Sequence, residues 1–223
     1  IISHMDASFC TTHPSSIKSL KGKNVKYIPN PVDKNFENLK IYENKSYKYD
    51  LFFALSHGVH RGTLKKGKVD LRETFLNKLI AMTKEIRFNL YGINDKQPVW
   101  AENFKNELNK SKMALNLSQG DPLKFYSSDR IAQLVGNGIL TFVEKKTKLN
   151  KLFNNNEVIF YKDLNDLSKK IIKNKNLNNL RKKIARNGML KYHKHMNSEK
   201  IASYIINKTF KFKNTEKFYW ENK

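Results

Sequence analysis

Short apolar segments alternate with amphipathic ones from residue 50 onward, and this alternation restricts the chain to few folds. The apolar segments are typical of buried strands and cover residues 51–55, 86–91, 113–117, 139–143 and 158–161. Segments with the spacing of helices lie between them, at residues 70–82 and 99–109 and after residue 126. Such alternation winds strands in parallel and covers both faces with helices. We therefore expect an α/β fold with a doubly wound, Rossmann-like parallel sheet.

Residues 126–142 combine a short amphipathic helix, a glycine stop and an apolar strand. Ser127, Ser128 and Asp129 are residue types that cap helix starts. Unpaired backbone amides and the positive end of the helix dipole favour an anion there. We therefore expect Ser127 and Ser128 to face a phosphate.

Two residues beside this helix start have two interpretations each. Tyr126 either stacks on a base or packs beside the helix cap. Arg130, one turn into the helix, is either a salt-bridged structural residue or a cation of the anion site. The residue types alone leave both choices open.

A basic, glycine-containing loop follows the first strand of the alternating region, over residues 56–67. It contains His57, Gly58, Arg61 and Lys66, but neither the dinucleotide motif GxGxxG nor the P-loop motif GxxxxGK[ST]. Its place at the carboxyl end of a parallel strand is where open α/β sheets bind ligands. The loop is either a basic surface loop or a diphosphate site.

Composition limits the remaining classes of function. The formal net charge of +23 suits anionic partners, although lysines are spread through nearly every segment, as on a dispersed solvated surface. The single cysteine, Cys10, cannot form an internal disulfide, and the six histidines make no pattern typical of a metal site. No apolar run is long enough to cross a bilayer and no signal segment opens the chain, so we expect a cytoplasmic protein.

The two ends of the chain differ from this alternating region. Residues 7–10 and 25–28 suit strands and residues 14–20 a short helix, whereas residues 29–48 are polar, begin with two prolines and suggest an interdomain linker. Asp163 can cap a helix, and a second helix is expected to halt near Gly188. A last helix with Ile201 and Tyr204 on one face should pack back on the fold.

The order and spacing of these features resemble the carboxyl-terminal, donor-binding half of a GT-B fold glycosyltransferase of group 1. Residues 25–33 resemble the strand and linker that join the two domains, and Arg61 with Lys66 resemble the donor-phosphate ligands. Residues 130–140 resemble the family's helix and glycine turn, with weaker landmarks at residues 160–164 and 186–188. The resemblance implies an acceptor-domain remnant and linker at residues 1–33, a donor domain at 34–197, and a carboxyl-terminal helix and tail at 198–223.

One departure from the family concerns two glutamates, seven residues apart, that frame the donor loop and helix in many relatives. The second falls here at Gln133 and the first near Phe125. Glutamine still accepts a hydrogen bond from a ribose hydroxyl but brings no charge.

The resemblance implies transfer of a sugar from a nucleotide-diphosphate donor, without a bound metal or cofactor, to a glycan, lipid-linked or protein acceptor. The substrate-binding residues it implies are His57, Gly58, Arg61, Lys66, Tyr126, Ser127, Ser128, Arg130 and Gln133. It names no catalytic residue, because a base would come from the first domain or be absent, and residues 1–223 alone should be inactive. It further implies a role in cell-surface polysaccharide biosynthesis, with peripheral contact to anionic membrane at the inner face.

Two other classes compete with this interpretation. A nucleic-acid-binding module would explain the charge and scattered aromatics, but the sequence lacks a helix-turn-helix, zinc-finger or aromatic RNA-binding signature, so no nucleic acid partner is expected. A noncatalytic GT-B-like scaffold on an anionic membrane is the other. Salt-dependent oligonucleotide binding would favour the nucleic-acid-binding module. Liposome binding without sugar turnover would favour the membrane scaffold.

Overall fold

The computed structural model describes residues 5–55, 63–64, 68–69, 71–94, 96–212, 216–221 and 223. Its centre is a five-stranded sheet in the order β6-β3-β7-β8-β9, with every neighbouring pair parallel. The strands are β3 (Tyr49–Ala54), β6 (Phe88–Tyr91), β7 (Ser111–Asn116), β8 (Leu140–Glu144) and β9 (Ile159–Tyr161). The parallel winding predicted from the alternating pattern is therefore confirmed.

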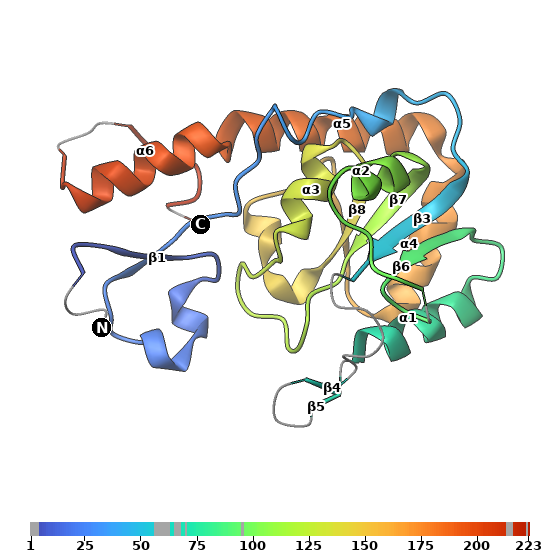
Figure 1. Ribbon diagram of the computed structural model, residues 1–223, viewed down its shortest axis with the longest axis horizontal. Coiled ribbons are helices and arrows are strands. Elements are labelled where there is room, and N and C mark those ends of the chain that lie inside the picture. The colour runs from blue at the N-terminus through green and yellow to red at the C-terminus, as the bar shows by residue number, and fades with distance from the viewer. Residues whose placement is uncertain are drawn as a thin grey trace.

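Helices cover both faces of this sheet (Figure 1). On one face, α1 (Leu71–Met82), α4 (Leu164–Asn176) and α5 (Asn178–His195) pack against side chains such as Phe53 and Leu115. On the other face, α2 (Ala101–Asn109) and α3 (Arg130–Gly136) pack against Phe52 and Ala114. Two buried faces explain why the strands are continuously apolar. The expected doubly wound α/β fold is confirmed.

The amino-terminal segment forms a separate two-stranded parallel sheet of β1 (Ser8–Cys10) and β2 (Val25–Tyr27). The helix expected over residues 14–20 is instead two single 3₁₀ turns, because Ile17 between them is extended, with φ −112° and ψ 108°. The strands β4 (Thr63–Leu64) and β5 (Lys68–Val69) form a small antiparallel pair between β3 and α1.

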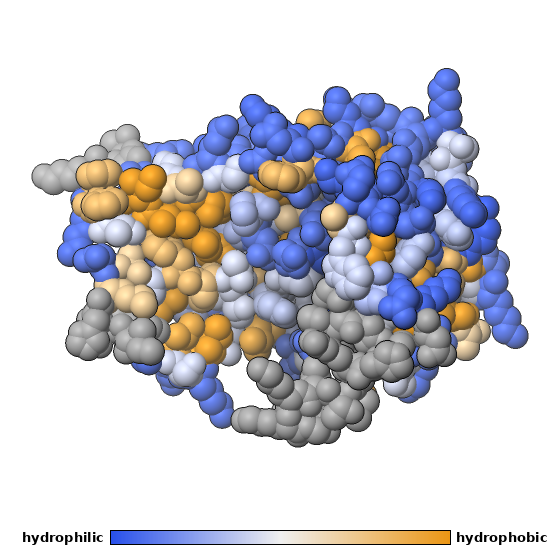
Figure 2. All heavy atoms as spheres, viewed as in Figure 1, coloured by the Kyte–Doolittle hydropathy of each residue, from blue (hydrophilic) through white to orange (hydrophobic). Residues whose placement is uncertain are grey.

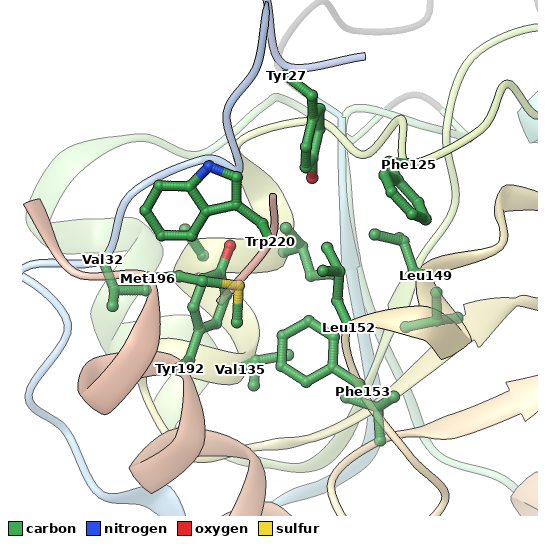
Figure 3. Close-up of a cluster of buried hydrophobic side chains, with 14 of the residues drawn as sticks. Tyr27, Val32, Phe125, Val135, Leu149, Leu152, Phe153, Tyr192, Met196 and Trp220 are labelled. Atoms are coloured by element: carbon green, nitrogen blue, oxygen red, sulfur yellow. The ribbon is translucent and has the colours of Figure 1, made fainter. Parts of the chain in front are cut away.

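The carboxyl-terminal helix α6 (Ser198–Thr209) lies beside the amino-terminal segment, away from the central sheet (Figure 1). Its Tyr204 packs against Phe9 of β1 and against Trp220 of the tail, with ring centroids 6.0 and 5.4 Å apart. Figure 3 shows the cluster of buried side chains that joins these parts to the sheet domain, including Tyr27, Tyr192 and Trp220. The prediction that the last helix packs back on the fold is confirmed.

Two predicted helix ends had different outcomes. Asp163 caps α4 as expected, since its carboxylate accepts a hydrogen bond from the Asp166 amide at 2.8 Å. The expected halt near Gly188 is wrong, because α5 continues to His195. A side chain at position 188 would collide with the Glu157 backbone. The glycine therefore allows α5 to approach that turn closely.

Residues 29–48, expected to be a linker, are packed tightly onto the sheet domain. Val32 and Ile41 are buried, and Val32 exchanges backbone hydrogen bonds with Met196 and Ser198 at the junction of α5 and α6. Gly136 allows this approach, because an added Cβ would lie 2.9 Å from side-chain atoms of Val32 and Glu37. The proposed domain boundaries stay a prediction.

Candidate functional site

The strand order places a topological switch point between β3 and β7. The chain leaves β3 through α1 on one face of the sheet and leaves β7 through α3 on the other. Helices that diverge in this way leave a crevice at the carboxyl ends of the two strands, where open α/β sheets bind ligands. Both predicted halves of the site follow these strands. His57, Gly58, Arg61 and Lys66 lie outside the described residues, so only the second half can be located.

A cavity of about 620 Å³ opens at this switch point. It lies between the end of β3, the starts of α2 and α3, and the segment after Pro31. Its lining comprises Phe36, Glu37, Ala54, Leu55, Val99, Trp100, Ala101, Glu102, Phe104, Lys105, Asp129, Arg130, Gln133 and Asn137. Of the predicted site residues, Arg130 and Gln133 are therefore brought to one cavity.

Arg130 lies at the buried end of the cavity. Its Nη1 donates a hydrogen bond to the Leu117 carbonyl at 2.9 Å, and its guanidinium lies over the Phe53 ring, 5.0 Å from the centroid. Leu117 follows β7 and Phe53 belongs to β3, so the guanidinium is held between the two strands of the switch point. These contacts give Arg130 a structural role, and they also fix a positive charge in the cavity wall.

Gln133 lies three residues after Arg130 and is the one residue of α3 that is not buried. Its backbone carbonyl accepts a hydrogen bond from Asn137 Nδ2 at 2.8 Å. Asn137 is 2% exposed and also binds the amides of Leu39 and Ile41, through its side-chain and backbone oxygens respectively. It thereby fixes the segment after Pro31 against α3. Sequence analysis missed Asn137, because the helix–glycine–strand pattern marks it only as a turn residue.

The two predicted serines differ in their surroundings. Ser127 is 5% exposed, and Asn30 Nδ2 donates to its carbonyl at 3.0 Å and to its hydroxyl at 3.4 Å. This contact ties the turn before α3 to the Pro29–Pro31 stretch. The Ser128 hydroxyl is covered and has no hydrogen-bond partner within the described ranges. The expected side-chain cap is wrong, because Asp129 is the N-cap of α3 and makes no side-chain cap hydrogen bond.

Asn116 and Ser118, which the sequence analysis did not select, are also unpartnered. Asn116 ends β7 and is 2% exposed, yet neither its Oδ1 nor its Nδ2 has a hydrogen-bond partner in the described part of the chain. The Ser118 hydroxyl is in the same condition. A buried polar group without a partner costs about 1–3 kcal/mol, so such groups at a binding edge point to a ligand or water that completes them. A polar residue ending an apolar strand is the signal that could have identified Asn116.

The loop before Tyr126 is held by the amino-terminal segment rather than opened toward the cavity. The His13 amide donates to the Lys124 carbonyl at 3.0 Å, and the Lys124 amide donates to the Ser16 hydroxyl at 3.1 Å. Phe125 is 1% exposed and packs against Tyr27 with ring centroids 5.1 Å apart. Burial, and secondarily the nearby Lys124 charge, lower the pKa of His13. Tyr126 itself is partly buried beside this loop.

The position near Phe125, where many relatives of the resembled family have a glutamate, is thus occupied by apolar packing. A carboxylate in that cluster would be buried among aromatic rings, with Lys124, whose Nζ lies 4.8 Å from the centroid of the Phe125 ring, as the neighbouring cation. The absence of the family's first glutamate therefore coincides with an aromatic cluster around Phe125. Elsewhere in the described ranges, no three His, Cys, Asp or Glu side chains gather where they could hold a metal ion.

Comparison with known proteins gives a consistent family match. A model described as glycosyl transferase-like matches residues 72–207. No curated protein sequence matches the chain significantly.

Solved structures resemble the fold at low sequence identity. A mutant of S. aureus TarM in complex with fondaparinux, alpha-GlcNAc-glycerol and UDP has a TM-score of 0.66 and 13% identity, with 93% of this chain and 44% of that chain covered. Anabaena HepE in complex with UDP and glucose has a TM-score of 0.66 and 9% identity, with 93% and 64% covered. Sucrose-phosphate synthase from Thermosynechococcus elongatus has a TM-score of 0.57 and 11% identity, with 84% and 52% covered. The chain therefore spans about half to two thirds of the structures it resembles.

Proposed function

The chain belongs to the glycosyl transferase-like family, and from this premise we propose that it binds the nucleotide-diphosphate-sugar donor of a glycosyltransferase. The observation that carries the proposal is the cavity at the β3/β7 switch point, which Arg130 and Gln133 line. Its place at the carboxyl ends of parallel strands is the usual ligand position in such sheets. The structures that resemble this chain include complexes with UDP, which supports the same donor class.

The described lining of the cavity carries two cations, Lys105 and Arg130, and three carboxylates, Glu37, Glu102 and Asp129, so a donor that leaves as a diphosphate needs further cations from the loop after β3. Arg61 and Lys66 of the loop after β3 are proposed to hold the phosphates, with Arg130 as a fixed cation between β3 and β7. Negative charge grows on the diphosphate as the glycosidic bond breaks, so fixed cations stabilise the transition state more than the ground state. Gln133 is proposed to accept a hydrogen bond from a ribose hydroxyl.

The assignment of the donor phosphates is tested by calorimetry on the whole chain with UDP, GDP and ADP. We expect one of them to bind, and Arg61→Ala combined with Lys66→Ala to weaken its binding on the order of a hundredfold, because each hydrogen bond to a charged group contributes about 1.5–3 kcal/mol. Lys173→Ala together with Lys194→Ala on α4 and α5 is the charge-matched control and should leave affinity within about twofold, since the change there is only long-range and screened. Unchanged affinity in the Arg61/Lys66 variant would remove both residues from the site.

The acceptor and the cellular location are further parts of the proposal. We propose a cytoplasmic enzyme of cell-surface polysaccharide biosynthesis that acts on a glycan, lipid-linked or protein acceptor. Within the described ranges, none of the helices combines the length and apolarity that a membrane span requires.

Peripheral contact with anionic membrane is supported by the far end of α6. Phe210 and Phe212 are 66% and 59% exposed there, beside Lys208 and Lys211. Hydrophobic atoms also gather on this end of the visible face, whereas the region over the sheet is largely hydrophilic (Figure 2). Exposed aromatics flanked by lysines suit a negatively charged lipid surface. Sedimentation with phosphatidylglycerol vesicles, but not with phosphatidylcholine vesicles, is the expected result.

A further inference from the structure

The cavity at the switch point has a buried end and an exposed end, and the two ends differ in chemistry. Leu55 and Arg130 at one end are 6% and 9% exposed. Phe36 and Trp100, which line the same cavity, are 64% and 57% exposed. The cationic end, at Arg130, therefore lies deep, and the aromatic side chains lie at the mouth together with the exposed carboxylates of Glu102 and Asp129.

Phe36 is exposed, but its backbone is fixed. Asp33 organises the turn: its carbonyl accepts hydrogen bonds from the amides of Phe36 and Glu37 at 3.0 and 2.7 Å. Its carboxylate in turn accepts a hydrogen bond from the Ser198 hydroxyl at 2.6 Å, which ties the turn to α6. The Glu37 carboxylate accepts from the Asp33 amide at 2.8 Å and closes the turn. A large apolar side chain is thus held at the cavity mouth by a turn with several anchors.

Trp100 is presented by a strained backbone. It is the N-cap residue of α2, and the next residue, Ala101, has φ +50°. A non-glycine residue in this left-handed region is uncommon and strained, and such residues cluster at functional sites. On either side of this turn Val99 and Phe104 pack against the buried cluster of β3 and α2, whereas Trp100 itself is mostly exposed. The turn places the indole and the start of α2 at the cavity mouth.

We infer that Phe36 and Trp100 bind the nucleobase of the donor by stacking on its flat faces. The inference rests on the proposed function, because it requires the diphosphate to lie at the cationic end. A nucleotide bound in that direction carries its base toward the mouth, where the two aromatic rings lie. Removal of one stacking aromatic side chain weakens base binding by about tenfold, and stacking tolerates different bases. The segment after Pro31 is then part of the donor site, in addition to joining two regions of the chain.

Tryptophan fluorescence gives a direct test, because the chain contains only two tryptophans and they differ in exposure. Trp100 lines the cavity, whereas Trp220 is 2% exposed within the cluster at α6. The whole chain is titrated with UDP, GDP, ADP and inorganic pyrophosphate, which lacks the base. We expect a nucleoside diphosphate to change the emission of the natural protein and of Trp220→Phe, but not that of Trp100→Phe. Pyrophosphate should leave the emission unchanged.

Affinities measured by calorimetry complete the test. Phe36→Ala and Trp100→Ala should each weaken nucleoside diphosphate binding about tenfold and leave pyrophosphate binding within about twofold. Leu190→Ala is the control, since Leu190 is a large apolar side chain, 50% exposed, on α5 and does not line the cavity. Equal loss for both ligands, or loss for neither, would overturn the stacking inference while the proposed function stands. A natural protein that binds neither class of ligand would overturn both.

Discussion

At the amino-terminal edge of the central sheet the buried carboxylate of Asp50 is fully paired, whereas at the carboxyl-terminal edge the buried amide of Asn116 has no partner among the described residues. Asp50 accepts two hydrogen bonds from the Arg87 guanidinium, at 3.1 and 3.2 Å, and lies 3.1 Å from Lys112 Nζ. Lys175 of α4 lies 3.5 Å from the same carboxylate.

We interpret the amino-terminal edge of the sheet as the part that stabilises the fold and the carboxyl-terminal edge as the part that binds a ligand. The amino-terminal edge satisfies its buried charge with Arg87, directly before β6, with Lys112 of β7 and with Lys175 of α4, which fixes those elements together. The carboxyl-terminal edge leaves polar atoms of Asn116, Ser118 and Ser128 without partners beside the switch point, whereas at the amino-terminal edge the Ser111 hydroxyl at the start of β7 is unpartnered among the described residues. Proteins commonly retain such costs where a ligand completes the pairing. A change at the amino-terminal edge should therefore lower stability and leave binding intact. A change at the carboxyl-terminal edge should weaken binding without lowering stability.

The largest effect is expected from Asp50→Asn. The change removes a buried negative charge that several cations share, so we expect the free energy of unfolding to fall by about 3 kcal/mol, measured by urea denaturation. Arg87 is 54% exposed and can regain solvation, which keeps the loss near the lower end for buried pairs. Affinity for nucleotide should remain, since the change lies at the opposite edge. Undiminished stability would show that the amino-terminal edge does not fix the sheet.

The same carboxylate should make stability depend on pH. Burial acts to raise the pKa of Asp50, but hydrogen bonds from Arg87 and Lys112 outweigh it and hold that pKa well below its usual value. A carboxyl group with a lowered pKa contributes stability above its unfolded pKa near 4, and the contribution is lost as the pH falls below that value. The stability difference between the natural protein and Asp50→Asn should therefore narrow between about pH 5 and pH 2.5. A constant difference would contradict the pairing.

A smaller effect on stability, with the opposite sign, is expected from Asn116→Leu. Leucine removes two unpartnered polar atoms and keeps a similar volume, so stability without ligand should be unchanged or higher by about 1 kcal/mol. Nucleotide affinity should fall. Asn89→Leu is the matched control: Asn89 is 3% exposed, but its Nδ2 donates to the Glu107 carbonyl at 3.0 Å. That variant should lose stability and retain affinity, and equal behaviour of the two variants would contradict the comparison.

Sequence patterns identified the sheet because each strand is apolar on both faces, and that property is local. They also placed Arg130 and Gln133 on a helix after the strand now seen as β7, because the pattern of an amphipathic helix, a glycine and an apolar strand is local in the sequence. The Asp50 network was missed, because its partners come from three elements that are distant in sequence.

The packing of residues 29–48 was missed for a related reason. Phe36 reaches the cavity because Gly136 permits close approach to α3 and Asp33 is tied to α6, and neither contact leaves a periodic pattern in the sequence. The continuation of α5 past Gly188 likewise depends on the distant Glu157 backbone. The predicted contacts of His57, Gly58, Arg61 and Lys66 stay predictions.

Hydrogen exchange of the whole chain with and without UDP, GDP or ADP, monitored by mass spectrometry, tests the central claim most directly. We expect the nucleoside diphosphate that binds to slow amide exchange at the starts of α2 and α3, in residues 99–105 and 127–137, and to leave residues 84–88 and 110–113 at the Asp50 edge unchanged. Slowed exchange at the Asp50 edge alone, or at neither edge with each of the three nucleotides in excess, would contradict the assignment of the β3/β7 switch point as the donor site.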